Sequence, residues 1–427
     1  MRSLIGLAAP VALARLGIMG MGVTDTIVVG QLAPTELSHL ALGWAPTGVM
    51  LVSGIGLLMG VQVLAARALG EGRPMDAGAV WRRGVVLGFA TGVVASLLLW
   101  FGVEPGMLLV GIDPTLAVGA AAVARVLSLS LPLHFAYVSC AFFVEAIHRP
   151  LAGTIVIWSA NLVNIAVNLL LVPEMGVIGS AWATVSARAV MFVALGAWIL
   201  LSKDGRDHGV RAAAPHAPSY HALLAIGGAA ALSQLAEAGA FSVMTVIAGR
   251  IGAEAVATYQ VLLNVLAVVF MVSLGASAAT AVLVAEAWGS RDVQGAGRAG
   301  WAGLTVNTAA MLVAAAVILL IPNLIARAFT SDVALVAQVA ALLPFAALVL
   351  APDGGQVVAS SALRARGDNW FPTASHVVAY VVVMPPLGWW LGEHLGLGVT
   401  GLMQAITAAS FLSVAVLMLR MHSLARP

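Results

Sequence analysis

Three acidic residues stand inside long apolar stretches of the sequence, where a carboxyl group is rarely tolerated. They are Asp25, Glu237 and Asp353, and none has a basic residue beside it in the sequence. A charged side chain at the centre of a bilayer costs about 2.5–3.5 kcal/mol even on insertion scales, so such groups normally face a protein interior or an aqueous cavity. Their positions predict carboxylates that handle cations in a membrane transporter.

Amide side chains accompany the first of these acids. Asn161, Asn164 and Asn168 follow one another at the spacing i, i+3, i+7, which places them on one face of a helix. Asp25 and Asn168 lie at similar distances from the outer ends of their predicted helices, so their depths in the membrane should match. Asp25, Asn164 and Asn168 are therefore candidates for a proton or sodium site. The alternative for Asn164 and Asn168 is the role that we expect of Asn161, which is to hold two helices together.

The second half of the sequence carries a different polar group. Glu237 and Asp353 both fall near the middle of predicted membrane spans, and Gln356 follows Asp353 by one helical turn. Gln260 and Asn264 are also one turn apart, so they share a helix face.

The composition requires a membrane protein. Hydrophobic residues make up 61% of the 427 residues and charged residues only 9%, with a mean hydropathy of +1.03, which a soluble domain of this size cannot have. Segments of about 20 apolar residues, each long enough for one helical crossing, recur throughout the sequence. We predict an all-α integral membrane protein with twelve transmembrane helices, at residues 6–30, 42–66, 84–103, 118–143, 151–172, 177–201, 221–248, 257–285, 300–321, 334–362, 371–391 and 398–419.

The loops between these spans differ in charge. Most arginines fall in the even-numbered loops and most loop acids in the odd-numbered ones, so the positive-inside rule predicts that both termini are cytoplasmic. The distribution also explains the pI near 9.0. A net charge of only +2 gives no reason to expect nucleic acid as a partner.

The sequence also contains an internal duplication. Residues from 13 onward align without a gap with residues from 232 onward, a shift of 219 residues. The matched pairs include Gly30 with Gly249, Gly70 with Gly289, and Asp113 with Asp332. Because each repeat holds six helices, an even number, the repeats should enter the membrane in the same orientation and be related by an axis along the membrane normal. We expect an N-lobe at residues 1–201, a cytoplasmic linker at 202–220 and a C-lobe at 221–427.

The three acids do not follow this duplication, so each repeat must have built its own polar site. The shift pairs Asp25 with Met244, Glu237 with Ile18, and Asp353 with His134. Three arginines also lie within apolar spans. We expect Arg125 and Arg188 to reach toward the membrane interface, whereas Arg15 is too deep for that and has no explanation in the sequence.

Motifs along nearly the whole chain resemble the multidrug and toxic compound extrusion (MATE) family, in particular its NorM-like branch. The order and spacing of the motifs together carry the resemblance. They are Val23-Thr24-Asp25-Thr26, Val29-Gly30, Gly70, Asn164-Ile165-Ala166-Val167-Asn168, Gly176-Val177-Ile178-Gly179-Ser180-Ala181, Glu237, Gln260-Val261-Leu262-Leu263-Asn264, Asp353, Leu363-Arg364-Ala365-Arg366-Gly367-Asp368 and Gly398-Val399-Thr400-Gly401.

The resemblance implies two six-helix lobes around a central cleft and the export of amphipathic, often cationic drugs by alternating access, in exchange for H+ or Na+. It also implies three sets of site residues. These are Asp25, Asn164 and Asn168 for a cation in the N-lobe, Glu237 and Asp353 for a cation in the C-lobe, and Gln260, Asn264 and Gln356 for the substrate cavity. Pro10 matches a helix-1 proline of the family and is the expected hinge. The helix-7 proline of many members is replaced by Ala229, which is equivalent to Pro10 in the repeat.

The same resemblance leads us to expect a monomer in the cytoplasmic (inner) membrane. Its partners would be the lipid bilayer and small organic cations or drugs, and it would need no cofactor and no metal ion other than Na+ as a coupling ion.

Two other transporter classes and one class of enzyme fit the sequence less well. A major-facilitator carrier also has twelve helices in parallel halves, but its Gly-Asp-Arg-Gly-Arg-like loop is absent after the second helix. A lipid-linked oligosaccharide flippase would need cavity arginines for pyrophosphate, whereas the deeply placed charges are mainly acids. An intramembrane enzyme would need a nucleophile with a base, or a metal cluster, and no such motif is present.

Overall fold

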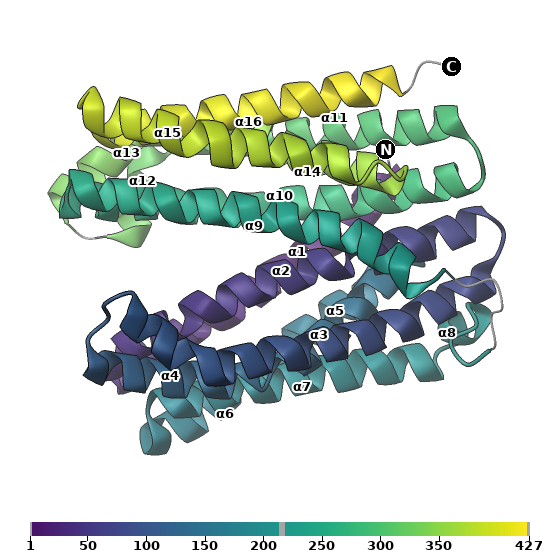
Figure 1. Ribbon diagram of the computed structural model, residues 1–427, viewed down its shortest axis with the longest axis horizontal. Helices are drawn as coiled ribbons and strands as arrows, with labels where there is room; N and C mark the ends of the chain where they lie inside the picture. The colour runs from purple at the N-terminus through teal and green to yellow at the C-terminus, as the bar shows by residue number, and fades with distance from the viewer. Residues whose placement is uncertain (1, 213–217, 331, 425–427) are drawn as a thin grey trace. The chain divides into compact units, whose positions relative to one another are not determined.

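The computed structural model describes residues 2–212, 218–330 and 332–424, and it contains no β-strand within these ranges (Figure 1). The elements are α1 (Arg2–Leu32), η1 (Pro34–Glu36), α2 (Leu37–Gly70), α3 (Pro74–Leu109), α4 (Pro114–Ser128), α5 (Leu131–Ala146), α6 (Pro150–Met175), α7 (Val177–Leu201), α8 (Lys203–Asp207), α9 (Tyr220–Ile251), α10 (Ala253–Gly289), α11 (Val293–Leu320), α12 (Pro322–Phe329), α13 (Val333–Ala365), α14 (Trp370–His376), η2 (Val377–Val383), α15 (Met384–Trp389), η3 (Trp390–His394) and α16 (Gly398–Ser423). The predicted all-α fold class is confirmed.

The predicted number of membrane spans agrees with the helices, although one predicted span is broken. Eleven spans of the described chain are long and apolar enough to cross a membrane, and α4 with α5, bent by 43°, forms a twelfth. Pro132 causes the break because it has no N–H to donate to the carbonyl of Ser128. The Ser96 hydroxyl donates to that carbonyl instead.

The span predicted at residues 371–391 also departs from a regular α-helix. It runs from Trp370 to His394 and alternates between α-helical and π-helical turns. Pro385 and Pro386 supply no backbone donors to the preceding turn, so the helix widens there into the π-helical segment η2.

Contacts between residues divide the chain into two units. We call Leu13–Ala231 the N-terminal unit, and Met1–Ala12 with Leu232–Pro427 the C-terminal unit. The boundaries fall inside α1, after Ala12, and inside α9, after Ala231. These two positions are equivalent under the shift of 219 residues. Each unit therefore includes the N-terminal end of the other repeat's first long helix.

Two equivalent glycines allow these helix ends to pack closely. A Cβ atom on Gly56 of α2 would lie 2.8 Å from the Cα of Ala231 in α9, and one on Gly275 of α10 would lie 2.5 Å from the carbonyl oxygen of Ala8 in α1. Gly56 and Gly275 are a matched pair of the duplication. Small residues at helix contacts let backbones approach in membranes, where no hydrophobic force drives helices together.

The repeat is also visible in how two helices begin. Asp113 accepts a hydrogen bond from the backbone of Thr115 at the start of α4, and Asp332 accepts bonds from Ala334 and Leu335 at the start of α13. The Thr115 hydroxyl also donates to Asp113, and these bonds hold the pKa of that exposed carboxyl below its usual value. The matched residues Asp113 and Asp332 thus have the same N-cap role.

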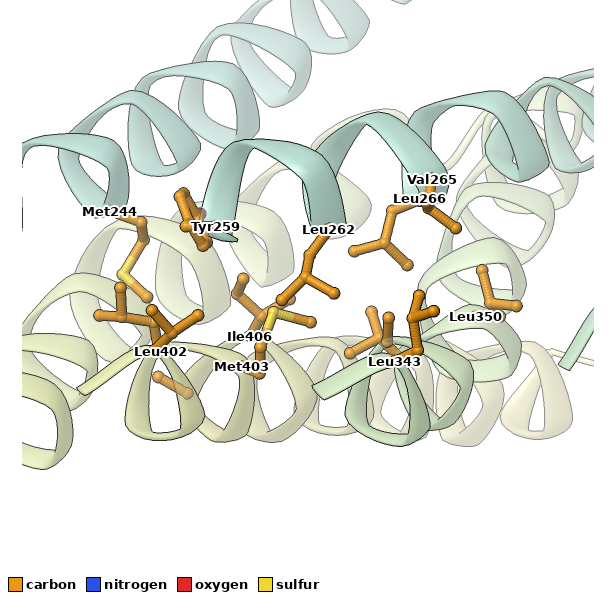
Figure 2. Packing of buried hydrophobic residues seen from close by; sticks show 14 of the residues in the cluster. Met244, Tyr259, Leu262, Val265, Leu266, Leu343, Leu350, Leu402, Met403 and Ile406 are labelled. Carbon is orange, nitrogen blue, oxygen red and sulfur yellow. The ribbon is translucent and has the colours of Figure 1, made fainter. Parts of the chain in front are cut away.

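The helices of the C-terminal unit enclose an apolar core. Met244 of α9, Tyr259 and Leu262 of α10, Leu343 of α13 and Met403 of α16 all contribute buried side chains to it (Figure 2). This core holds together the helices that carry the two acids of the C-terminal unit, Glu237 on α9 and Asp353 on α13.

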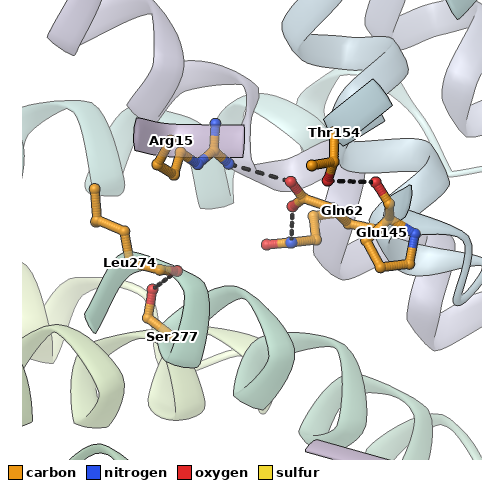
Figure 3. Close-up of polar contacts among 7 residues, drawn as sticks. Arg15, Gln62, Glu145, Thr154, Leu274 and Ser277 are labelled. Carbon is orange, nitrogen blue, oxygen red and sulfur yellow. Dashed lines mark hydrogen bonds and ion pairs between the residues drawn. The ribbon is translucent and has the colours of Figure 1, made fainter. Parts of the chain in front are cut away.

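Arg15, which the sequence left unexplained, is part of a buried polar group in the N-terminal unit (Figure 3). Its guanidinium lies 3.3 Å from Glu145 Oε1, and Gln62 Nε2 donates to Glu145 Oε2 at 2.6 Å. The Arg15 and Glu145 side chains are only 12% and 8% exposed, and Arg15 also lies over the ring of Phe142. The group joins α1, α2 and α5.

We predict that Gly56→Val and Gly275→Val each lower the stability of the protein by about 1–3 kcal/mol, because the added side chain forces two backbones apart. Thermal unfolding in detergent measures the change. Gly48→Val is the control, since a Cβ there meets no atom within 4 Å. Equal midpoints for the Gly48 and Gly56 variants would contradict the close packing.

We predict that Arg15→Met destabilises the protein by about 3–5 kcal/mol, because Glu145 then keeps a buried charge without its partner. Adding Glu145→Met should recover part of that loss. Arg250→Met is the matched control: its pair with Glu393 is exposed, so the loss should stay below about 1 kcal/mol. A double variant no more stable than Arg15→Met would argue against a buried ion pair.

Candidate functional site

Asp25 is enclosed by side chains from two other helices. It is 0% exposed. Its Oδ1 accepts hydrogen bonds from Asn168 Nδ2 at 2.8 Å and from Asn164 Nδ2 at 3.1 Å, and its Oδ2 accepts one from the Thr184 hydroxyl at 2.6 Å. We call these four residues the Asp25 cage. The cage joins α1 to α6 and α7.

The face of α6 that carries the amides packs against α1. Asn161, one turn before Asn164, donates to the carbonyl of Gly17 at 3.0 Å, which is the interhelical role expected for it. A Cβ on Gly17 would lie 2.2 Å from a methyl group of Ile157, so the absence of a side chain there permits the approach. The contact fixes the register that brings Asn164 and Asn168 to the depth of Asp25.

The amide oxygens of the cage have no partners. Asn164 Oδ1 and Asn168 Oδ1 are buried without a hydrogen bond from any described residue, although buried polar atoms are nearly always paired. The nitrogen and oxygen of an amide are assigned from the hydrogen-bond network, and rotating each amide by half a turn exchanges them. A carboxylate, two amide oxygens and a hydroxyl are the oxygen ligands that hard cations prefer.

Arg188 does not reach toward the membrane interface, so that expectation is wrong. It is 4% exposed, donates to the Ser130 hydroxyl at 2.7 Å, and lies over the ring of Trp44 with 5.4 Å between guanidinium carbon and ring centroid. Ser130, at the break between α4 and α5, and Trp44 give the guanidinium partners in the interior. Arg188 also attracts Asp25 electrostatically. Arg125, by contrast, is half-buried and pairs with Glu104.

A cavity of about 520 Å³ lies within the N-terminal unit beside the cage. Its walls come from α1, α2, α5 and α7. They consist of Ile18, Met19, Met21, Gly22, Thr26, Leu37, Leu40, Ala41, Trp44, Leu51, His134, Thr184, Arg188 and Met191. Thr184 belongs to both features, because it lines the cavity and donates to Asp25.

The two acids of the C-terminal unit are close enough to repel each other electrostatically. Glu237 Oε1 accepts a hydrogen bond from Gln356 Nε2 at 3.3 Å. Asp353 Oδ1 accepts hydrogen bonds from the hydroxyls of Tyr380 at 3.1 Å and Ser410 at 3.3 Å. Both acids are half-buried. The sequence therefore indicated the right neighbours for Glu237, Asp353 and Gln356.

A buried arginine also lies near Glu237 and Asp353. Arg364 is buried, donates to the Ser233 hydroxyl at 2.6 Å, and attracts Glu237 electrostatically. The acids have no basic residue beside them in the sequence, but in the folded protein an arginine lies near Glu237 as one lies near Asp25.

Two predicted cavity residues lie apart from these contacts. Gln260 and Asn264 are exposed on α10. Neither hydrogen-bonds to Glu237, Asp353 or Gln356 in the described chain. Their shared helix face was predicted correctly, and their contact with cargo stays a prediction.

Sequence reasoning missed three hydroxyl groups that donate hydrogen bonds to the acids, those of Thr184, Tyr380 and Ser410. Serine and threonine are common in membrane helices, where they often bond to their own backbone, so a single hydroxyl carries little signal. Thr184 and Arg188, one turn apart, did mark one face of α7.

Known proteins share both the sequence and the fold. A sequence profile of the MatE family matches residues 10–170 and 229–390, and both matches begin at equivalent positions of the repeat. The chain is 42% identical to a "Probable multidrug resistance protein NorM" of Caulobacter vibrioides, covering 99% of this chain and 91% of the relative. It is 33% identical to a "Multidrug resistance protein NorM" of Burkholderia vietnamiensis, covering 96% of this chain and 91% of the relative.

Solved structures of MATE transporters have the same fold as this chain. The eukaryotic MATE transporter AtDTX14 superposes with a TM-score of 0.89 at 19% identity, over 98% of this chain and 94% of that one. A multidrug resistance MATE family transporter of the MOP superfamily in an outward-facing conformation gives a TM-score of 0.91 at 18% identity, over 100% and 96%.

The helical spans and these likenesses define a multi-pass membrane transporter with the two-lobed MATE fold. The chain belongs to the MatE family, the multidrug and toxic compound extrusion transporters. The resemblance inferred from the sequence is thereby confirmed, and so is the prediction that the protein is not an enzyme.

We predict that Asn164→Leu and Asn168→Leu each weaken binding of a sodium ion or a proton at Asp25 by about tenfold or more, because each removes a polar group that contacts this buried carboxyl. Intrinsic tryptophan fluorescence during sodium and acid titrations of the purified protein measures the affinity. Asn307→Leu is the control, since Asn307 is a buried amide of α11 in the C-terminal unit and makes no hydrogen bond within the described chain. An unchanged affinity in the Asn168 variant would remove the amides from the site.

Proposed function

We propose that this protein exports amphipathic drugs and toxic organic compounds, chiefly organic cations, in exchange for H+ or Na+. The observation that carries the proposal is the Asp25 cage, a buried carboxylate held by α6 and α7 with two amide oxygens that lack partners. Relatives whose names describe multidrug resistance support the drug cargo. The family match favours this function over a major-facilitator carrier.

The proposed location is the cytoplasmic (inner) membrane, with both termini on the cytoplasmic side and the protein acting as a monomer. The concentration of arginines in the even-numbered loops supports that orientation. Cargo would be small organic molecules that reach the protein from the cytoplasm or the bilayer.

The coupling cation of the N-lobe binds to the Asp25 carboxylate in this proposal. Asp25 is on α1 and its partners are on α6 and α7. A cation bound by Asp25 and by these partners would therefore hold α1 against α6 and α7. Its release would free α1. Pro10, fifteen residues before Asp25, removes one backbone hydrogen bond from α1 and is the proposed hinge.

The second proposed cation site is formed by Glu237 and Asp353. A cation relieves the repulsion between two close carboxylates, and Gln356 holds Glu237 in place through its hydrogen bond. Gln356, Gln260 and Asn264 would supply polar contacts to cargo. A cationic cargo and the coupling cation then compete for the same negative charges, which is the basis of exchange.

The proposed lobes are residues 1–201 and 221–427, joined by a linker at 202–220. Alternating access requires the lobes to change their packing without unfolding. The contact units cut α1 after Ala12 and α9 after Ala231, so the helix ends before these residues are the segments that a change of access must reposition.

We predict that Asp25→Asn and Glu237→Gln each abolish coupled efflux while leaving folded, membrane-inserted protein. The neutral isosteres keep the volume and remove the cost of a buried charge, so a loss must come from cation handling. The measurement is drug efflux from proteoliposomes under an imposed pH gradient and, separately, an imposed sodium gradient, which also identifies the coupling ion.

Glu104→Gln is the matched control for this experiment. Glu104 is a partly exposed acid paired with Arg125, and its loss should leave efflux near the wild-type rate. Efflux at the wild-type rate by the Asp25 variant would reduce that acid to a structural role. Efflux driven by neither gradient in the unaltered protein would overturn the proposed exchange.

A further inference from the structure

A buried histidine of the C-terminal unit has no partner for either of its ring nitrogens. His376, the last residue of α14, is 3% exposed, and neither Nδ1 nor Nε2 is hydrogen-bonded to any described residue. A neutral imidazole ring carries one N–H donor and one acceptor nitrogen, and buried polar atoms are nearly always paired with protein or with water. The ring therefore requires partners that the described chain does not supply.

Two neighbouring side chains also hold buried polar atoms without partners. They are Nε of Arg364 on α13 and Oδ1 of Asn369, just before α14. Arg364 is joined to α14 through hydroxyl groups, because it donates to Ser233 at 2.6 Å and Ser233 donates to Thr373 at 3.2 Å. Arg364 also acts electrostatically on His376. A buried water typically makes about three hydrogen bonds to such polar groups, and this cluster offers both donors and acceptors.

The cluster lies between the two acids of the C-terminal unit and one end of that unit. The rings of His376 and Tyr380 meet edge to face with 5.8 Å between their centroids, and the Tyr380 hydroxyl donates to Asp353. Arg364 attracts Glu237 electrostatically. In the other direction, the cluster reaches the loop between α13 and α14, an even-numbered loop that the proposed orientation places in the cytoplasm.

The internal repeat indicates that packing alone does not require a histidine at this position. The shift of 219 residues pairs His376 with Ile157 and Thr373 with Thr154, and each threonine donates to the carbonyl four residues before it. Ile157 is 1% exposed and packs against Gly17. An aliphatic side chain thus fills the equivalent position of the N-terminal unit, so the imidazole of the C-terminal unit has a role other than filling space.

We infer that His376 transfers protons between the Glu237 and Asp353 carboxyl groups and the cytoplasmic side, through water held by Arg364 and Asn369. The inference rests on the proposed exchange of cargo for H+ and adds the route that the proton takes. A proton that leaves a carboxyl group passes to water and then to the acceptor nitrogen of His376. The other ring nitrogen gives its proton to water nearer the loop, and exchange with water restores the first tautomer. The carboxyl group loses one proton, the cytoplasm gains one, and the ring is unchanged.

The charges near His376 favour transfer of a proton over its retention. The ionisable groups that neighbouring elements bring to this region are Glu237 of α9, Asp353 and Arg364 of α13, Tyr380 of η2, and Arg420 of α16, which pairs with Asp368. The guanidinium of Arg364 acts on the ring directly. Because a guanidinium and an imidazolium repel each other, a proton that reaches the ring is passed on and not stored.

Stopped-flow mixing of the purified full-length protein with tetraphenylphosphonium, in the presence of a pH-indicator dye, tests the inference. This organic cation has a fixed charge and no proton of its own, so every proton released comes from the protein. We expect His376→Ile and His376→Gln each to slow proton release by about tenfold or more, the effect of losing a positioned proton-transfer group, without changing the final number of protons released. Isoleucine is the side-chain type at the equivalent position of the repeat, and glutamine keeps hydrogen bonds to water if the first variant does not fold.

His394→Gln is the matched control, because His394 is an exposed histidine at the opposite end of the same span. It should change neither the rate nor the number of protons. An unchanged rate in the His376 variants would overturn the route. So would fewer protons released at an unchanged rate, because His376 would then shape the acid pair without carrying its protons.

Export of tetraphenylphosphonium from proteoliposomes, measured with a selective electrode, keeps this inference distinct from the proposed function. Export driven by a sodium gradient, with no proton release by the unaltered protein, would overturn the proton route and leave the exporter intact. Proton release that is slowed in the His376 variants, with no export under either gradient, would support the route and overturn export.

Discussion

The structure depends on the requirement that polar groups inside a membrane find their partners within the protein, because the hydrocarbon offers none. Asp25 satisfies this requirement with donors from α6 and α7. Asn161 adds a bond from α6 to the backbone of α1, and Arg15, Gln62 and Glu145 join α1 to α2 and α5. The position of α1 is thus set by polar contacts, and in the proposed mechanism a cation or a proton changes those made by Asp25.

The two units supply partners to their buried acids with different residues. In each, a buried arginine accompanies the acids and bonds a serine: Arg188 with Ser130, and Arg364 with Ser233. The N-terminal unit holds one carboxylate in an amide cage, whereas the C-terminal unit holds two that repel each other. The shared helices provide the scaffold, and duplication has allowed the polar sites to diverge.

Much of this arrangement follows from the sequence, because its signals are periodic. Apolar length gave the membrane spans, helical spacing placed Asn164 and Asn168 on one face, and matched depth predicted their contact with Asp25. The break between α4 and α5 had a signal in the sequence, Pro132, which the prediction of one span at residues 118–143 did not use. The interior position of Arg188 could not be predicted in the same way. It depends on which helices pack together, and Arg188 meets Ser130 and Trp44 from distant parts of the chain. The sequence pattern of a span with one arginine is the same whether that arginine faces lipid headgroups or a neighbouring helix.

The central claim of the proposal is that the acids of the two units, Asp25 in one and Glu237 with Asp353 in the other, hold coupling cations that are released when cargo binds. Calorimetry in buffers of different ionisation enthalpy counts the protons released when an organic cation binds to the purified protein, and a sodium electrode counts sodium ions in the same titration. The account predicts that binding to the unaltered protein releases a cation, that Asp25→Asn releases less, and that Asp25→Asn combined with Glu237→Gln releases none. A release that is unchanged in Asp25→Asn would contradict it.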